Sequence, residues 1–512
     1  MASTSRVRTA LSALVIACLT LAGCSSGGRA TNGGAPNRAP NGAPNGVPGQ
    51  PNAPATPAPY GSYGYAYDGF ATEVDPATDP QSTFAMDVDT ASYGYARNLI
   101  NQGRRPSPQD IRPEEFVNAF REDYPQPTGN GFTVTLDGTH LPTTHHPQRT
   151  GDVRLLRIGL QTRADDAGQR PDAALTFVID VSGSMGEPGK LDMVKQALHT
   201  LIDQLRPSDS VAIVTFSDEA QTIRPMTPVS HRADLHSSID QLNVQGSTNL
   251  EAGLVKGYQE ARAGFRAGIT NRVILLSDGL ANVNDTAAAP ILAQVREAAD
   301  KQIALLGVGV GTDYGDKLME QLADHGNGYV VYVSELAQAR KVFVTQLPAT
   351  LAVRAIDAKV QVTFDPRTVA GYRLIGYDDR KLADSSFRND RVDGGEVGPG
   401  HSVTALYTVR LRDGADGRLA EARIRWQDPA DHEAHEAADT VTVTDLGGSF
   451  TEAAPRLQVC YVAAYFAEAL RNSPYRTEVN LNDLSQIANH AADRTDDTDV
   501  TDLATLIRRA SD

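Results

Sequence analysis

Between residues 174 and 347, apolar runs of strand length alternate with segments of helical periodicity, and this pattern constrains the fold most strongly. The first run, residues 174–180, is continuously apolar and ends in a carboxylate, as in a strand that is buried on both faces. The next segment, residues 190–205, has leucine, valine and isoleucine at helical spacing. Strands that alternate with helices favour right-handed crossovers and a mostly parallel sheet with helices on both faces. Further strands are expected at 210–216, 271–278, 303–310 and 329–333, and further helices at 233–242, 248–265, 290–301, 314–324 and 336–347.

The segments on either side of this α/β unit have a different, two-residue periodicity. Alternating runs occur at residues 132–136 and 153–160 upstream, and they recur between residues 356 and 445 downstream. This alternation indicates antiparallel strands, and two upstream strands are too few for an independent sheet. We therefore expect both flanks to form one antiparallel β-domain into which the α/β unit is inserted. Helices are expected at 91–102, 113–120, 452–472 and 480–509.

The first residues have the pattern of an export signal. Two arginines precede an apolar run, about residues 10–22, which is too short to span a bilayer as a mature helix. The run ends in Leu21-Ala-Gly-Cys24, which resembles the lipobox of bacterial lipoproteins and implies acylation of Cys24. An ordinary cleaved signal with a chance cysteine is the alternative. We expect a lipid-anchored protein at the extracytoplasmic face of the cell membrane.

The composition is acidic and poor in cysteine. Lys and Arg number 47 against 63 Asp and Glu, which gives a formal net charge of −16. This balance argues against a nucleic-acid-binding protein, which needs a basic face to displace counterions from phosphate. The three cysteines (Cys18, Cys24 and Cys460) cannot form a disulfide framework.

Oxygen-bearing side chains follow the expected strands at the edge where such sheets bind ligands. Asp180, Ser182 and Ser184 follow the first strand, and alternate residues of an extended loop point the same way. Thr248 stands at the start of an expected helix, and Asp278 ends another strand. Two carboxylates and three hydroxyls without sulfur or imidazole suit a hard divalent cation, Mg²⁺ or Mn²⁺. Each hydroxyl alone is more simply explained as a helix cap, and Asp278 as a turn residue, but their joint placement favours a metal.

The series Asp-x-Ser-x-Ser, then Thr, then Asp resembles the metal-ion-dependent adhesion site of the von Willebrand factor type A (vWA) fold. This resemblance implies direct ligation by Ser182, Ser184 and Thr248. It implies that Asp180 and Asp278 act mostly through water, and that an acidic group of a protein partner takes the sixth position on the ion.

A closer resemblance, to bacterial vWA lipoproteins of the YfbK-like kind, covers most of the chain after the signal. It is carried by residues 82–93, 111–120 and 205–215, and it continues through 319–328 and 400–407.

The chain departs from that group directly after Asp278-Gly279. There Leu280-Ala-Asn-Val-Asn replaces Asp-Phe-Asn-Val-Gly. Because this loop borders the expected metal, we expect the preferred ligand to differ while the metal ligands are kept.

Together these patterns and the resemblance predict an α/β fold: a doubly wound, mostly parallel sheet of the vWA type inserted in an antiparallel β-domain, with a C-terminal helical segment. The expected parts are a lipoprotein signal peptide (1–23), a disordered Pro/Gly/Asn linker (24–79), an N-terminal helical/β region (80–170), the vWA domain with its metal site (171–350), a β-sandwich-like region (351–447) and C-terminal helices (448–512).

The expected function is binding. A lipid-anchored surface protein would bind Mg²⁺ through its vWA domain and, through the ion, an acidic residue of an unidentified protein partner. The alternative is a non-adhesive scaffold or sensor of cell-envelope assembly.

We expect no enzymatic activity, because the sequence shows no general base with a plausible partner near the site. Two motifs that look catalytic fail on spacing: Gly186-Glu-Pro-Gly-Lys190 as a phosphate loop and His432-Glu-Ala-His435 as a zinc motif.

Overall fold

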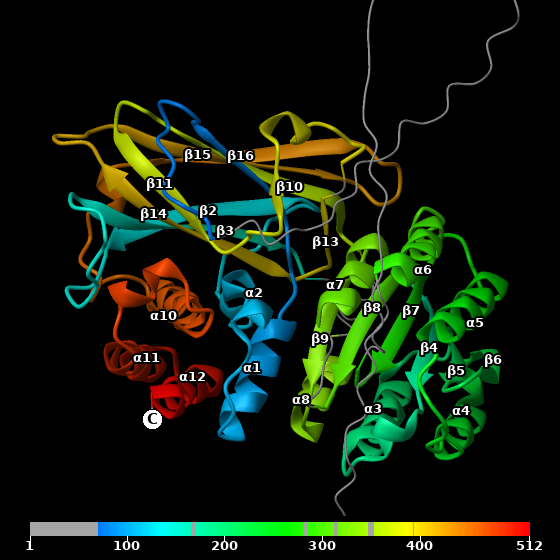
Figure 1. Cartoon of the computed structure of the whole chain (residues 1–512). Coiled ribbons are helices and arrows are strands. Elements are labelled where there is room, and N and C mark those ends of the chain that lie inside the picture. The colour runs from blue at the N-terminus through cyan, green and yellow to red at the C-terminus, as the bar shows by residue number, and fades with distance from the viewer. Residues whose placement is uncertain are drawn as a thin grey trace, which may run out of the picture. The chain divides into compact units, whose positions relative to one another are not determined.

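The structure is a computed structural model that describes residues 70–164, 170–279, 285–311, 316–346, 353–392 and 394–511. The expected signal peptide, the expected lipidation site Cys24 and most of the expected linker lie outside these residues. The described residues form three β-sheets with covering helices (Figure 1). Within these same ranges, no helix combines the length and the apolar character that crossing a membrane requires.

The α/β unit is built on one six-stranded sheet with the order β6-β5-β4-β7-β8-β9. Neighbouring strands from β5 to β9 pair in parallel, whereas the edge strand β6 pairs antiparallel with β5. Strand β6 was not predicted, because it is largely half-exposed and lacks a continuous apolar run. The bounds are β4 (Ala173–Asp180), β5 (Ser210–Phe216), β6 (Ala220–Pro228), β7 (Thr270–Ser277), β8 (Ile303–Val310) and β9 (Tyr329–Val333).

Side chains of the central strand β4 enter two separate apolar cores. Phe177 and Ile179 pack in the core on one face of the sheet, and Val178 packs in the core on the other. Because the sheet is covered on both faces, the predicted doubly wound arrangement is confirmed. The first face is covered by α3 (Lys190–Gln204), α4 (Arg232–Asp240) and α8 (Leu336–Arg340), and the second by α5 (Leu250–Ala263), α6 (Asp285–Ala299) and α7 (Asp316–His325).

The flanking segments form two antiparallel sheets that share one apolar core. One sheet has the order β12-β1-β10-β15-β16, with β13 also paired to β10, and the other has the order β11-β14-β3-β2. Strand β3 pairs with β14, so the segment before the α/β unit joins the segment after it, as predicted. The bounds are β1 (Gln81–Ala85), β2 (Phe132–His140), β3 (Val153–Thr162), β10 (Ala355–Phe364), β11 (Val369–Ile375), β12 (Lys381–Leu382), β13 (Gly395–Val397), β14 (Ser402–Leu411), β15 (Arg418–Gln427) and β16 (Ala434–Thr442).

Residues 70–79 differ from the prediction, which placed them in the linker. Val74 pairs with Tyr372, and Glu73 forms an ion pair with Arg410 at 2.6 Å. Strand β1, which follows directly, pairs with β10 and β12. Residues 70–79 and strand β1 are held on the β-domain by partners about 280 to 340 residues away in the sequence. The local composition therefore did not predict that residues 70–79 pack on this domain.

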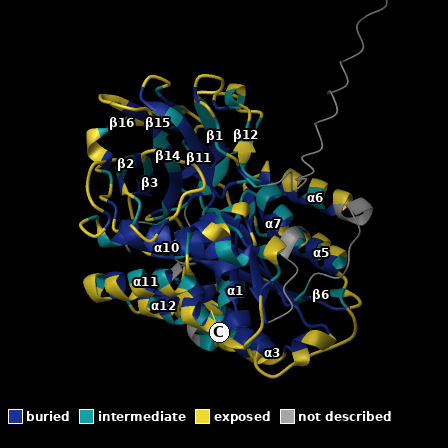
Figure 2. Ribbon diagram, turned by 60° about the vertical axis from the view of Figure 1, so that its left-hand side comes forward, coloured by how far each residue is buried: buried dark blue, intermediate teal, exposed yellow. Residues whose placement is uncertain are grey.

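A helical layer packs on the four-stranded sheet of the β-domain. Its helices share one apolar cluster with Leu155 and Leu406 of that sheet. Helix α10 is buried on nearly all sides, in keeping with its apolar sequence, whereas α11 and α12 are exposed on their outer faces (Figure 2). The expected helix 480–509 is two helices, which separate at Asp496 in a left-handed conformation (φ 50°). The bounds are α1 (Ala91–Asn101), α2 (Pro113–Asn118), α10 (Pro455–Leu470), α11 (Leu481–Thr495) and α12 (Thr498–Ser511).

Candidate metal centre at the strand ends

Asp180 is the last residue of β4, and its side chain is fully buried. Its Oδ1 accepts a hydrogen bond from the backbone N of Ser182 at 2.9 Å, and its Oδ2 accepts one from Oγ of Ser277 at 2.7 Å. Burial raises the pKa of Asp180, the neighbouring Asp278 carboxylate adds to this, and the hydrogen bonds partly offset it. The loop after β4 and the end of β7 therefore fix the orientation of this carboxylate.

Ser182, Ser184 and Asp278 form a continuous chain of oxygen atoms. The hydroxyls of Ser182 and Ser184 lie 3.2 Å apart, and Oγ of Ser184 donates to Oδ1 of Asp278 at 2.8 Å. Ser182 and Asp278 are buried and Ser184 between them is exposed, so the chain of oxygen atoms reaches the surface at its middle member. Ser182 precedes a short 3₁₀ turn (Gly183–Gly186) that it does not cap, so the helix-cap explanation is wrong for this residue.

Thr248 lies in a loop that is hydrogen-bonded to the loop carrying Ser182 and Ser184. The backbone N of Gly183 donates to the carbonyl O of Gly246 at 3.0 Å. Helix α5 begins after this loop, and its cap is Asn249, whose Oδ1 accepts from the backbone N of Ala252 at 3.0 Å. The half-buried Thr248 is therefore not the cap, and within the described residues it makes no hydrogen bond to the other four predicted ligands.

Lys190, which the sequence presents only in a motif that fails as a phosphate loop, lies beside Asp278. Its Nζ lies 2.8 Å from Oδ2 of Asp278 and 2.8 Å from Oε2 of Glu187. The buried stem passes Gly311, where φ is 91° and a Cβ would lie 2.6 Å from Cε of the lysine. Burial lowers the pKa of Lys190, but the bonds to the two acids outweigh it and the pKa is raised. The ammonium is thus an internal counter-charge for Asp278.

Two more polar side chains support these loops and were also missed. Oγ of Ser277 lies 2.7 Å from Oδ2 of Asp180 and 2.8 Å from the carbonyl O of Gly279, so these two acceptors share its one proton. Asp218 follows β5 and accepts from the backbone N and the hydroxyl of Ser247, which lowers the pKa of Asp218. Ser277 ends β7, and Asp218 lies two residues after the end of β5. Their positions at the ends of apolar strands could have indicated that they belong to the site.

The donor set fits a hard divalent cation. Hydroxyl and carboxylate oxygens from the loops after β4 and β7 gather here without sulfur or imidazole among the predicted ligands, which suits Mg²⁺ or Mn²⁺. Hydrogen bonds connect Asp180, Ser182, Ser184 and Asp278, and the loop contact of Gly183 and Gly246 brings in the Thr248 loop. Their role as metal ligands stays a prediction. Residues 280–284, where the departure from the related group was noted, lie outside the described residues.

Most of the described chain matches sequence models of known families. Residues 174–345 match the von Willebrand factor type A domain, and residues 65–149 match a family described as von Willebrand factor. Residues 349–512 match the family described as the C-terminal part of the uncharacterized protein YfbK.

Several known proteins are similar to this chain. The chain is 32% identical over 441 residues to the uncharacterized protein YfbK of Escherichia coli (strain K12), covering 81% of this chain and 75% of that protein. It is 28% identical over 169 residues to inter-alpha-trypsin inhibitor heavy chain H1 of Mesocricetus auratus, covering 31% of this chain and 18% of that protein. A solved structure, a von Willebrand factor type A protein from Catenulispora acidiphila, aligns at 15% identity and a TM-score of 0.44 over 73% of this chain and 89% of its own.

Proposed function

The chain belongs to the family of YfbK-like proteins with a von Willebrand factor type A domain, and on this premise we propose that the domain binds Mg²⁺ or Mn²⁺ and, through the ion, a protein partner. A vWA domain itself indicates a role in protein–protein interaction. The observation that carries the proposal is the oxygen chain that runs from buried Ser182 through exposed Ser184 to Asp278.

The residues of the site would act as follows. Ser182, Ser184 and Thr248 would hold the ion directly, with Asp180 and Asp278 acting mostly through water. The bound ion would supply an electrophilic position for an oxygen ligand. The serine hydroxyl at the surface faces a carboxylate that is already paired with Lys190, which supports a binding role over a catalytic one.

Electrostatics favour an acidic partner residue. The buried charges of Asp180, Asp278 and Lys190 sum to −1, so a divalent ion would change the local charge to +1. Glu187 also contacts Lys190, but its side chain is 55% exposed and solvent screens its charge. A carboxylate from a partner would therefore be attracted to the loaded site.

The test compares Thr248→Ala with Asn243→Ala in the purified chain, stripped of metal with a chelator. Thr248 contributes no hydrogen bond to the other four predicted ligands, so its removal should lower metal affinity without unfolding the site. Asn243 is the matched control because it is exposed in the same loop and its amide donates to the carbonyl O of Gln241. Mg²⁺ at about a hundred times the Kd of this site should add about 2.7 kcal/mol of stabilisation through the site in the wild type and in Asn243→Ala. Thr248→Ala should lose most of this gain, measured by thermal unfolding.

A partner assay completes the test. Wild-type protein should capture a protein from cell-envelope extract in Mg²⁺ and release it in EDTA, whereas Thr248→Ala should not capture it. Equal metal-induced stabilisation of Thr248→Ala and wild type would contradict the metal site. Capture that persists in EDTA would contradict the metal-dependent mode and favour the scaffold alternative.

We further propose that Cys24 is lipidated and anchors the protein at the extracytoplasmic face of the membrane. The support is the sequence Leu21-Ala-Gly-Cys24 after an apolar run. Cys24→Ser should release the protein into the medium or leave it unprocessed, as followed by fractionation and mass spectrometry. Membrane retention of a normally processed Cys24→Ser product would exclude the lipid anchor.

A further inference from the structure

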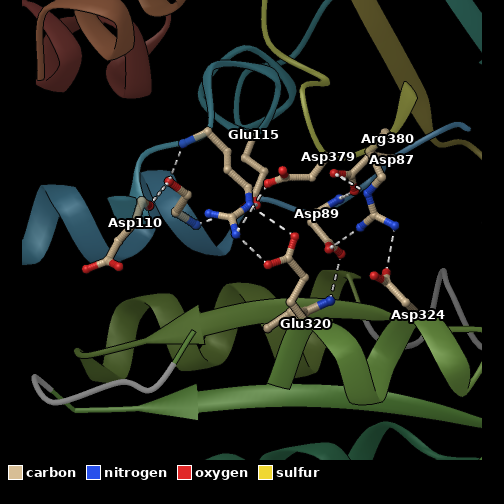
Figure 3. A network of polar contacts seen from close by, with 11 residues as sticks. Asp87, Asp89, Asp110, Glu115, Glu320, Asp324, Asp379 and Arg380 are labelled. Atoms are coloured by element: carbon tan, nitrogen blue, oxygen red, sulfur yellow. Dashed lines mark hydrogen bonds and ion pairs between the residues drawn. The ribbon is translucent and has the colours of Figure 1, made fainter. Parts of the chain in front are cut away.

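A second group of acids lies at the opposite end of the α/β sheet, near the start of β9 (Figure 3). Asp87 and Asp89 belong to the segment between β1 and α1, and Glu115 lies on α2. One carboxylate oxygen of each lies within 4.8 Å of the others, and each residue is at least 96% buried. We call these three residues the junction triad, because their contacts reach both the α/β unit and the β-domain.

A backbone amide orients each carboxylate of the junction triad. Oδ1 of Asp87 accepts from the N of Asp89 at 2.7 Å, and Oδ1 of Asp89 accepts from the N of Val330 at 2.7 Å. Oε2 of Glu115 accepts from the N of Ser92 at 2.8 Å. Hydrogen bonds of this kind fix ligating carboxylates in metal sites.

The charges near Asp87 and Asp89 are poorly balanced. Oδ2 of Asp87 is buried and accepts no hydrogen bond, and it lies 3.5 Å from Nε of Arg380. Oδ2 of Asp89 lies 3.4 Å from Nη2 of the same arginine. The shortest contact of Arg380 in this group is with Asp324, at 2.6 Å. One arginine therefore faces three carboxylates, and it is nearest to the one outside the triad.

The second arginine is also engaged outside the triad. Oε1 of Glu115 lies 3.8 Å from Nε of Arg112. The guanidinium of Arg112 also binds Glu320 of α7, through contacts of 3.0 Å from Nε and 2.6 Å from Nη2.

We propose that the junction triad binds a second hard divalent cation, Ca²⁺ or Mg²⁺, independent of the site at the strand ends. Three ionised carboxylates carry −3, and a divalent ion together with Arg380, which Asp87 and Asp89 share with Asp324, would offset most of this charge. The ion would connect the segment before α1 with α2, beside β9 of the α/β unit and Arg380 of the β-domain. Its role would be to hold these parts of the chain together.

The experiment counts bound ions on the full purified chain. After chelation, the protein is dialysed against Ca²⁺ or Mg²⁺ in separate arms, and bound metal is measured by elemental analysis. Wild type should bind two divalent ions, and Glu115→Gln should bind one. Asp379→Asn is the matched control, because this acid lies 3.9 Å from Arg112 but outside the triad, and it should still bind two. The arm with the higher occupancy identifies the preferred ion.

A double variant at the other site makes the test independent of the folding of Glu115→Gln. Ser184→Ala with Thr248→Ala leaves the junction triad intact, and it should still bind one ion. A folded double variant that binds none, or Glu115→Gln that binds as many ions as wild type, would overturn the proposal. Failure of the strand-end site alone would look different: wild type would bind one ion, and Glu115→Gln rather than the double variant would lose it.

Discussion

The strand-end site and the junction triad both gather carboxylates beside the same sheet, but they differ in how their charge is balanced. At the strand ends, hydroxyls separate the acids, Lys190 neutralises one of them, and the exposed Ser184 opens the site to solvent. In the junction triad, all three acids are buried, and the arginines beside them, Arg380 and Arg112, also bind acids outside the triad. An open site can exchange a partner, whereas a closed one can only join parts of its own chain.

The largest expected effect comes from removing the arginine of the junction. Arg380→Met should lower the free energy of unfolding by about 3–5 kcal/mol, because it leaves buried carboxylates without their counter-charge. The measurement is denaturant unfolding in the presence of a chelator. Arg388→Met is the control, since this side chain is 64% exposed in its pair with Glu436 and its loss should cost less than about 1 kcal/mol. Similar costs for the two variants would mean that buried charge does not stabilise the junction.

A smaller effect is expected at His401, also close to this end of the sheet. Its ring contacts Tyr329 of β9 edge-on at 6.1 Å between centroids, and burial together with Arg272 lowers the pKa of His401 to about 4. The unfolded chain therefore binds more protons between pH 6.5 and 4, so this histidine reduces stability as the pH falls through that range.

The comparison of wild type with His401→Gln isolates this contribution. Between pH 7 and 4, wild type should lose about 2 kcal/mol more than the variant, less than the full shift implies because the ring is partly exposed. Unfolding curves at several pH values in a chelator provide the measurement, and His231→Gln, at an exposed histidine, is the control. Parallel pH profiles for wild type and His401→Gln would refute the assignment.

The two regions also differ in how much of them the sequence predicts. The strand-end residues could be predicted because each follows or precedes an element with clear local periodicity, as Asp180 follows the continuously buried β4. Lys190 could not, because its contact with Asp278 depends on a fold that brings together residues 88 positions apart. The position of a lysine at the start of a helix does not by itself indicate an acid beyond another strand.

The junction triad could not be predicted from local periodicity. The amide that orients Asp89 belongs to Val330, 241 positions later, and its arginine neighbour Arg380 is 291 positions away. Strands β1 and β12 nearby are short and find their partners across similar separations. Local patterns thus predict the layers of the fold and the edge where ligands bind, whereas charges buried between layers depend on long-range pairing.

The smallest expected effect tests the role of Lys190 at the open site. Lys190→Met removes a positive charge that is bound to Asp278, so Mg²⁺ affinity should rise about tenfold, equal to about 1.4 kcal/mol. The metal-free variant should unfold at a lower temperature than wild type, because the buried Asp278 loses its partner.

Calorimetric titration with Mg²⁺ measures the affinity of Lys190→Met and wild type. Lys195→Met on the same helix is the control, since its Nζ donates to the carbonyl O of Asp240 and not to an acid of the site. If affinity falls in Lys190→Met, the lysine positions Asp278 for the metal, and the counter-charge interpretation is wrong.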